Sequence, residues 1–150
     1  MKTLLVRSLI ALTAATILTG TTRAGDAAWL TDYQKAIAQA KTENKAVLLD
    51  FTGSDWCGWC IKMVKDTLSQ KEFTDYAAKH LVLVEVDFPN KKEVPAETKK
   101  QNEELQKKFD VKGFPTFLLL DKNGKEIGRQ RGYLEGGPAA FIAKLDGFKK

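Results

Sequence analysis

Short apolar runs alternate with amphipathic segments along most of this chain of 150 residues. Residues 46–51 and 81–87 are nearly continuous apolar runs, which is typical of strands buried on both faces. Residues 116–120 form a third such run. It is followed by Asn123-Gly124, a pair that predicts a type I′ hairpin turn into a returning strand over 126–131.

The segments between these runs carry apolar residues at helical spacing, beginning with Trp29 and Tyr33. Thr31 with Gln34, and Ser69 with Glu72, have the spacing of capping boxes, which predicts two helix starts. The predicted helices cover 31–43, 57–68 and 97–109, and two more begin at 69 and 138. This order predicts an α/β fold, a central mixed sheet of about four strands with helices on both faces. The first two strands are expected to be parallel, with the working site beyond their carboxyl ends.

Residues 1–24 have the pattern of a secretory signal peptide. Lys2 and Arg7 precede an apolar stretch, and Thr22 and Ala24 are small residues that fit cleavage after Ala24. The apolar stretch is short of the roughly 20 residues that a membrane span needs, so an uncleaved anchor is the less favoured interpretation. We therefore predict one domain over 25–150, in a periplasmic or secreted protein. Loss of the peptide lowers the formal net charge from +5 to +2, which argues against nucleic-acid binding.

The chain has 2 cysteines and 1 histidine, and this count excludes several classes of protein. It is too low for a disulfide-rich scaffold, and too low for a four-ligand structural zinc site unless carboxylates contribute. Cys57 and Cys60 lie in the segment Trp56-Cys57-Gly58-Trp59-Cys60, just after the first predicted strand. In an exported protein such a pair is a structural disulfide or a redox couple, and a metal site is a third interpretation.

Two considerations favour the redox couple. A disulfide across so short a loop removes little chain entropy, about 2 kcal/mol against about 3 kcal/mol for a 15-residue loop, so it is a weak structural brace. A cysteine at the start of a helix faces unpaired N–H groups, which lower a thiol pKa from about 8.5 toward 7 or below. Cys57 is then predicted to attack a substrate disulfide, and Cys60 to resolve the mixed disulfide.

Four separated features resemble the thioredoxin superfamily across nearly the whole predicted domain. They are the strand ending at Asp50-Phe51 with the two-cysteine motif, the strand ending at Val86-Asp87, the segment Gly113-Phe114-Pro115-Thr116, and Lys122-Asn123-Gly124 followed by Gly132. Gly53-Ser54-Asp55 before the motif is similar to exported bacterial members of that superfamily. The resemblance implies a thioredoxin fold and thiol–disulfide exchange, for which no bound cofactor or metal is needed.

The resemblance also implies roles for individual residues. Pro115, as a cis-proline, leaves the backbone of Phe114 free to pair with an extended substrate strand. Asp50 resembles the buried acid that takes the proton from the resolving cysteine. The residues expected at the substrate-binding surface are Trp56, Gly58, Trp59, Phe114, Pro115 and Gly132, with Tyr133 on its apolar rim.

Departures from the family pattern leave two questions open. Trp59 stands where thioredoxins carry proline, so the direction of electron flow is not determined. One additional residue separates Asp50 from Cys57, and Leu83 stands where the family has a basic partner for that acid, so the role of Asp50 is also open. The only histidine, His80, is expected to be a surface or structural residue.

The expected function is an exported thiol–disulfide oxidoreductase that reduces disulfides in protein substrates. We expect it to be re-reduced by a membrane electron shuttle, to be a monomer and not to bind nucleic acid. One alternative is a disulfide oxidase or isomerase that uses the same cysteines. Another is a non-catalytic module that binds peptides in the apolar groove, which would need neither cysteine.

Overall fold

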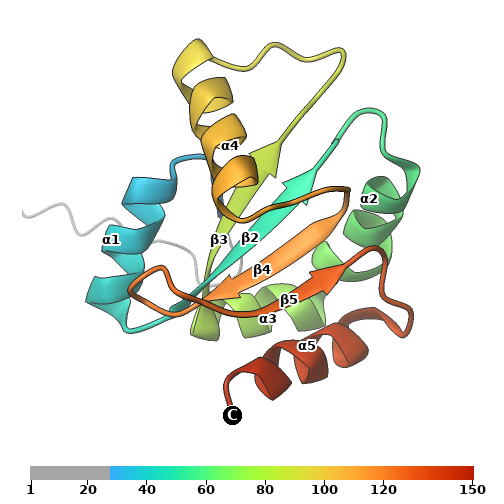
Figure 1. The fold of residues 1–150 in the computed structure, drawn as a ribbon. Coiled ribbons are helices and arrows are strands. Elements are labelled where there is room, and N and C mark those ends of the chain that lie inside the picture. The colour runs from blue at the N-terminus through green and yellow to red at the C-terminus, as the bar shows by residue number, and fades with distance from the viewer. Residues whose placement is uncertain (1–27) are drawn as a thin grey trace, which may run out of the picture.

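A five-stranded mixed sheet runs through the centre of the computed structural model, which describes residues 28–150 (Figure 1). The strand order is β1-β3-β2-β4-β5. β1 and β2 pair parallel with β3, whereas β4 pairs antiparallel with both β2 and β5. The strands are β1 (Trp29–Leu30), β2 (Ala46–Thr52), β3 (Leu81–Asp87), β4 (Thr116–Leu120) and β5 (Glu126–Arg131). The signal peptide predicted over 1–24 lies outside the described residues.

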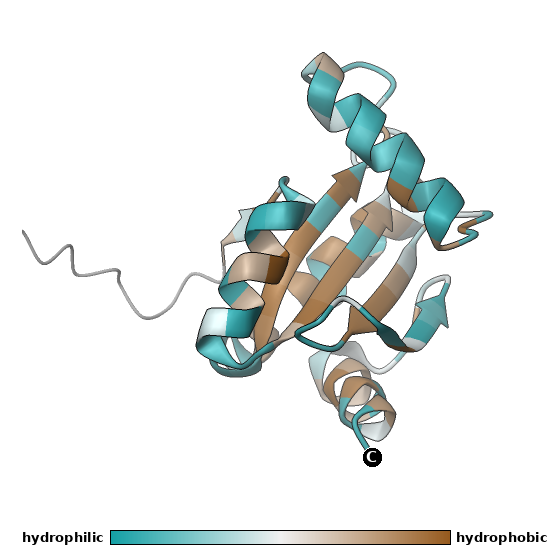
Figure 2. Ribbon diagram, turned by 60° about the vertical axis from the view of Figure 1, so that its left-hand side comes forward, coloured by the Kyte–Doolittle hydropathy of each residue, from teal (hydrophilic) through white to brown (hydrophobic). Residues whose placement is uncertain are grey.

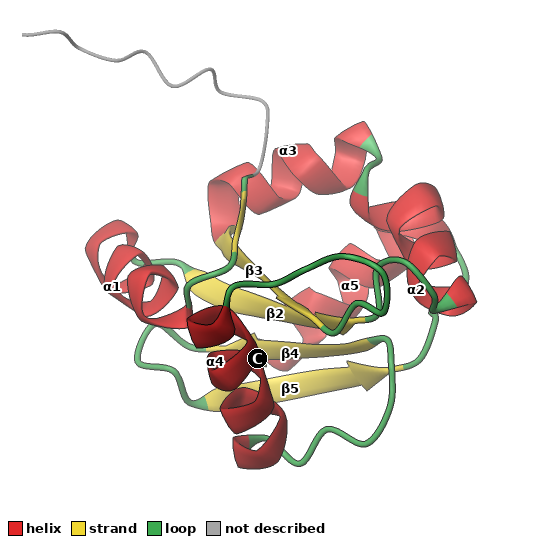
Figure 3. Ribbon diagram, turned by 90° about the horizontal axis from the view of Figure 1, so that it is seen from above, coloured by secondary structure: helices red, strands yellow, loops and turns green. Residues whose placement is uncertain are grey.

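Helices cover both faces of the sheet, so the fold has three layers (Figure 3). One face packs against α1 (Tyr33–Glu43) and α4 (Ala96–Lys108). The opposite face packs against α2 (Gly58–Met63), the π-helical turn η1 (Val64–Leu68), α3 (Lys71–His80) and α5 (Gly137–Phe148). This is the predicted α/β architecture and a thioredoxin fold.

β2 is buried on both faces because its side chains alternate between two cores, and Figure 2 shows the apolar strands enclosed by the helices. Val47, Leu49 and Phe51 pack in the core beneath α1 and α4. Leu48 packs in the core beneath α2, α3 and α5. Asp50 follows Leu48 by two residues, so its carboxyl group lies on the face that α2 covers.

The predicted starts of two helices are wrong by one residue. Asp32, not Thr31, is the N-cap of α1, and its carboxylate accepts a hydrogen bond from the Lys35 N–H at 3.0 Å. Trp29 does not join the helical stripe but pairs with Leu83 in β1, which adds the fifth strand. Asp32 caps the helix because its carboxylate has more acceptor capacity than the Thr31 hydroxyl. Trp29 and Leu30 form a strand because they gain the backbone hydrogen bonds of the sheet.

Ser69 is not the N-cap of α3, because that position is taken by Gln70. The Ser69 hydroxyl instead donates to the carbonyl oxygen of Val64 at 2.7 Å, at the end of the preceding helix. That helix was predicted to be continuous to residue 68, but its second half is the π-helical turn η1. The wider turn leaves carbonyl groups that Ser69 satisfies, so its side chain is not available to cap α3.

The predicted hairpin between β4 and β5 is present, but its turn is not type I′. Gly124 has a positive φ of 84°, whereas Asn123 does not have the positive φ that a type I′ turn requires. The Gly124 N–H donates to the Asp121 carbonyl at 3.0 Å, and the Asp121 carboxylate accepts from the N–H groups of Asn123 and Lys125. Asp121 therefore organises a longer loop than the two central residues alone predicted.

Among the described residues, no helix combines the length and the apolar character that crossing a membrane requires.

Two glycines, one in β5 and one in α5, should change the free energy of unfolding in opposite directions when each is replaced by alanine. An added Cβ at Gly128 would overlap the ring of Phe148, so Gly128→Ala is expected to lower the free energy of unfolding by about 1–3 kcal/mol. An added Cβ at Gly147, inside α5, meets no atom within 4 Å, so Gly147→Ala should raise it by up to about 1 kcal/mol. Guanidinium unfolding of both variants in the oxidised state measures the free energy of unfolding. An equal loss of stability in the two variants would contradict the packing described.

Candidate active site

Cys57 and Cys60 form a disulfide at the N-terminus of α2, just beyond the carboxyl end of β2. Their Cα atoms are 5.2 Å apart. Cys57 is the N-cap residue of α2, and its Sγ accepts a hydrogen bond from the Cys60 N–H at 3.2 Å. Cys57 is 7% exposed and Cys60 2%, so an incoming group reaches Cys57 first. The cysteines thus lie where the parallel strands predicted the working site.

The loop before the motif is fastened to the loop that follows β3. The Ser54 N–H and hydroxyl donate to the two carboxylate oxygens of Asp87 at 2.9 and 2.5 Å. The carboxylate of Asp55 accepts three backbone N–H groups, from Asn90, Lys91 and Lys92, at 2.7 to 3.1 Å. These bonds join segments more than 30 residues apart and hold the approach to Cys57 in one conformation.

An aromatic cluster lies on the Trp56 side of the disulfide. The Trp56 indole N–H donates to the carbonyl oxygen of Phe88 at 2.8 Å, and its ring forms a T-shaped pair with the Phe114 ring at 6.1 Å between centroids. Phe88 stacks on Phe114 at 5.1 Å. Trp56 remains 47% exposed, so this cluster offers an apolar surface next to Cys57.

A second group of residues near the motif includes Trp59, Pro115 and Gly132. The Phe114–Pro115 peptide bond is cis, and the Pro115 carbonyl accepts the Gly132 N–H at 2.8 Å. Trp59 is 60% exposed and its ring lies 5.6 Å from that of Tyr133. The structure therefore brings the predicted surface residues from three separate segments around the motif, while Gly58 lies exposed at the first position of α2.

Asp50 is buried beneath this site with an unpartnered carboxylate oxygen, Oδ1. The β2–β3 register places Asp50 directly beside Glu85, on the same face of the sheet. Burial, followed by the negative charges of Glu85 and Asp87, raises the pKa of Asp50 well above its usual range. Burial and the Asp87 charge also raise the pKa of Glu85. The site thus holds an acid that binds its proton unusually tightly.

Glu85, Asp55 and Phe88 were not among the residues predicted for the site. Glu85 was detectable: the two strands have seven residues each, and Asp50 and Glu85 are each the fifth. Leu83, expected opposite the acid, instead pairs with Leu48. Asp55 carried no such signal, because its partners are backbone groups of a distant loop. His80 lies exposed at the end of α3, with its ring 4.7 Å from the ring of Tyr76.

Within residues 28–150, no three histidine, cysteine, aspartate or glutamate side chains gather closely enough to hold a metal ion. The reactive groups that the site offers are the two sulfur atoms, the buried carboxyl group of Asp50 and the half-buried one of Glu85. Such a site exchanges a disulfide for two thiols, with proton transfer to or from a carboxylate.

Comparisons with known proteins agree with this chemistry. The disulfide bond reductase DsbH of Chlamydia pneumoniae is 43% identical over 113 residues, which cover 75% of this chain and 68% of that protein. The thioredoxin-related protein DsbJ of the same organism is 34% identical over 101 residues, covering 67% of this chain but only 29% of DsbJ. This chain therefore corresponds to less than a third of DsbJ.

Solved structures show the same fold. A structure of the oxidoreductase DsbH has a TM-score of 0.77 at 40% identity, covering 87% of this chain and 91% of that one. The C-terminal domain of Neisseria meningitidis DsbD shares the fold with a TM-score of 0.58 at 20% identity, over 80% of this chain and 98% of that one. A family model for the thioredoxin-like domain matches residues 33–149. The chain belongs to the thioredoxin-like family and is a thiol–disulfide oxidoreductase.

Proposed function

We propose that this protein is an exported disulfide reductase in which Cys57 attacks and Cys60 resolves. The observation that carries the proposal is the Cys57–Cys60 disulfide at a helix N-terminus, with Cys57 as the more exposed of the two and as the acceptor of the Cys60 N–H. That N–H already points at the sulfur that would carry negative charge, which favours its thiolate form.

The reaction begins with the reduced protein. The Cys57 thiolate attacks one sulfur of a substrate disulfide, the substrate S–S bond breaks, and the first substrate thiolate leaves. The Cys60 thiolate then attacks Cys57 Sγ, which breaks the mixed disulfide and releases the second substrate thiolate. Two electrons pass to the substrate, and the protein returns to the oxidised state that the structure shows.

Asp50 is proposed to accept the proton of the Cys60 thiol before the second step. It lies on the sheet face that α2 covers, and one of its oxygens has no hydrogen-bond partner. Its raised pKa makes the carboxylate a stronger base than an exposed aspartate, closer to the pKa of a thiol. Glu85 contributes by its charge, because a neighbouring carboxylate disfavours ionisation of Asp50.

The relatives support the proposed direction of electron flow and the proposed export. DsbH, similar over three quarters of this chain, is described as a disulfide bond reductase, and the Dsb names recur among the other relatives. We propose disulfide-containing proteins as substrates, re-reduction by a dithiol partner at the membrane, export by cleavage near Ala24, and action as a monomer. The apolar surfaces beside Trp56 and Trp59 would contact an extended substrate segment along Phe114 and Pro115, with close approach at Gly132.

The two cysteines should have separable roles. Cys60→Ser is expected to accumulate a covalent mixed disulfide with substrate, because the attacking sulfur remains and the resolving one is lost. Cys57→Ser should form no adduct and should reduce insulin disulfides at less than about a hundredth of the wild-type rate. Non-reducing electrophoresis and the insulin reduction rate measure this. Wild-type reduction by Cys57→Ser would refute the mechanism.

The redox potential of the cysteine pair distinguishes a reductase from an oxidase. Equilibration with reduced and oxidised glutathione should give a value near about −270 mV, as for thioredoxin, rather than near about −120 mV, as for a strong oxidant. Alkylation of free thiols followed by mass spectrometry measures the reduced fraction. A value above about −180 mV would support the oxidase or isomerase alternative and contradict the reductase.

Asp50→Asn should slow release of substrate from the mixed disulfide by about a hundredfold, within the range for loss of a general base. In the wild type, this release step should accelerate with pH through an ionisation above the ordinary carboxyl range, because the Asp50 pKa is raised. Glu85→Gln is the matched variant: it removes the neighbouring charge, so the midpoint should move to lower pH. Stopped-flow measurement of the second step tests both, and an unchanged profile in Asp50→Asn excludes Asp50 as acceptor.

Stability provides an independent check of the Asp50 ionisation. An acid whose pKa is higher in the folded state favours folding below its unfolded pKa, and this contribution is lost as pH rises through the folded pKa. The oxidised Asp50→Asn variant should therefore be more stable than the wild type at pH 7, with a smaller difference at pH 4. Thermal unfolding at the two pH values measures this, and a larger gain at pH 4 would contradict the raised pKa.

A further inference from the structure

The rings of Trp59 and Tyr133 form one wall of an open cavity beside the disulfide. The cavity has a volume of about 460 Å³ and is lined by Trp59, Phe114, Pro115, Gly132, Tyr133 and Glu135. Its apolar walls come from α2 on one side and from the segment before β4 on the other. A Cβ placed on Gly132 meets no atom within 4 Å, so the floor of the cavity is open. Glu135 is the only charged residue among those that line it.

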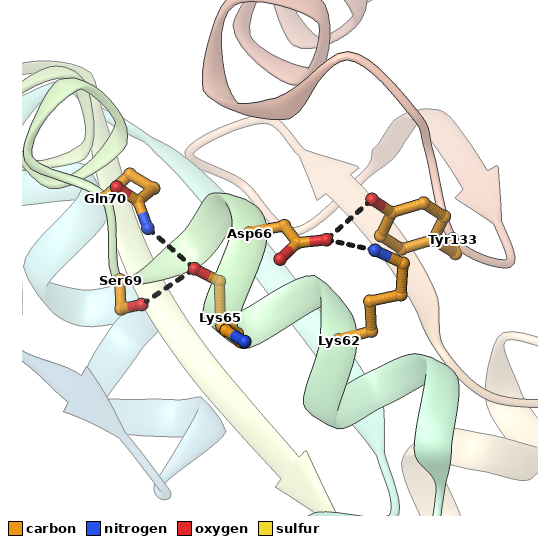
Figure 4. Close-up of polar contacts among 6 residues, drawn as sticks. All are labelled: Lys62, Lys65, Asp66, Ser69, Gln70 and Tyr133. Carbon is orange, nitrogen blue, oxygen red and sulfur yellow. Dashed lines mark hydrogen bonds and ion pairs between the residues drawn. The ribbon is translucent and has the colours of Figure 1, made fainter.

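The Tyr133 ring is held in this wall by two side chains of the neighbouring helical segment (Figure 4). Its hydroxyl donates to Asp66 Oδ2 at 2.9 Å, and the same oxygen pairs with the Lys62 ammonium. Lys62 Nζ also lies 4.8 Å from the centroid of the Tyr133 ring. A hydrogen bond to a carboxylate is stronger than one between neutral groups, so Tyr133 is fixed from its hydroxyl end as well as by Trp59.

Trp59, Lys62 and Asp66 share one side of this segment because they are three and four residues apart. Asp66 lies in η1, where the Ser69 N–H reaches back five residues to the Val64 carbonyl at 2.9 Å. The Gln70 amide donates to the Lys65 carbonyl at 2.7 Å (Figure 4). The Ser69 hydroxyl donates to the Val64 carbonyl, also at 2.7 Å. Hydrogen bonds from Ser69 and Gln70 thus close the turn that carries Asp66, and π-helical turns of this kind are often found at functional sites.

We infer that this cavity is a subsite for an aromatic side chain next to the substrate cysteine, and that Asp66 is a positioning residue that pre-organises it through Tyr133. The inference rests on the proposed disulfide reduction. Trp59, Phe114 and Tyr133 offer ring faces and edges to a substrate ring, and aromatic pairs favour such contacts beyond the area they bury. The negative charge of Glu135 disfavours an acidic residue at the same position.

Two peptides that differ only in the residue beside a single cysteine, phenylalanine or glycine, test the subsite. Each cysteine is loaded as a mixed disulfide with thionitrobenzoate, whose release by the reduced protein is followed by absorbance. The wild type should react about fivefold faster with the phenylalanine peptide, within the range of about 2- to 13-fold for one aromatic contact. Tyr133→Ala should bring this ratio close to one.

Asp66 is tested by the same ratio. Asp66→Ala should lower the ratio of the two rates to about two, because the Tyr133 hydroxyl loses its acceptor. Asp66→Asn should give a ratio between this value and that of the wild type, because the amide oxygen still accepts from the Tyr133 hydroxyl. Tyr133→Phe removes only the hydroxyl and is expected to match Asp66→Ala, which keeps the test valid if Asp66→Ala does not fold. A full wild-type ratio in Tyr133→Phe and Asp66→Ala would overturn the positioning role.

Tyr76→Phe is the matched control. Tyr76, like Tyr133, donates to an aspartate, Asp146 at 2.5 Å, and lies near a lysine, Lys149, but it lies between α3 and α5. It should keep the wild-type ratio, and a reduced ratio there would show that the effect is a general loss of stability. Equal rates of the wild type with both peptides would overturn the proposed subsite but would leave the proposed disulfide reduction standing. Absence of thionitrobenzoate release from either peptide would instead contradict the proposed function.

Discussion

The parallel pairing of β2 with β3 is the constraint on which the site depends. Seven residues of each strand pair in register, so both strands end at the same edge of the sheet. The loop that carries the cysteines and the loop of residues 88–95 therefore start side by side. The same register places Asp50 beside Glu85 beneath α2. A shift of one residue in either strand would turn the acid of that strand to the other face, away from its partner.

Hydrogen bonds of two carboxylates join the loops at this edge. Asp55 satisfies three consecutive backbone N–H groups, and Asp87 binds both donors of Ser54. These bonds give partners to backbone donors of a segment that contains neither helix nor strand, and they tie it to the loop of the cysteines. With the loops held in this way, the rings of Trp56 and Trp59 remain exposed next to Cys57.

Asp50, which is buried, and Glu85, which is half-buried, lower the stability of the fold and fit the proton transfer proposed for the site. An unpartnered carboxyl group at the centre of a sheet weakens folding at neutral pH, and a second carboxylate beside it increases that effect. Apolar residues at these two positions would pack as well as Leu48 and Leu83, the preceding pair on the same face. The acids are understandable where a proton has to move to or from a buried thiol.

Local patterns predicted much of this protein. The three main strands, the hairpin, the helices and the place of Cys57 and Cys60 follow from hydrophobic periodicity and from short spacings, because these depend on neighbours within a few residues. Three local predictions were wrong: Ser69 as the N-cap of α3, a continuous helix to residue 68, and a type I′ hairpin turn. Competing hydrogen bonds of Ser69 and Asp121 decided these features. Only the tertiary structure brought Asp55 to the 90–92 backbone and Asp66 to Tyr133. Those contacts join residues 35 to 67 positions apart, and no local pattern records which distant groups a side chain will meet once the sheet has formed.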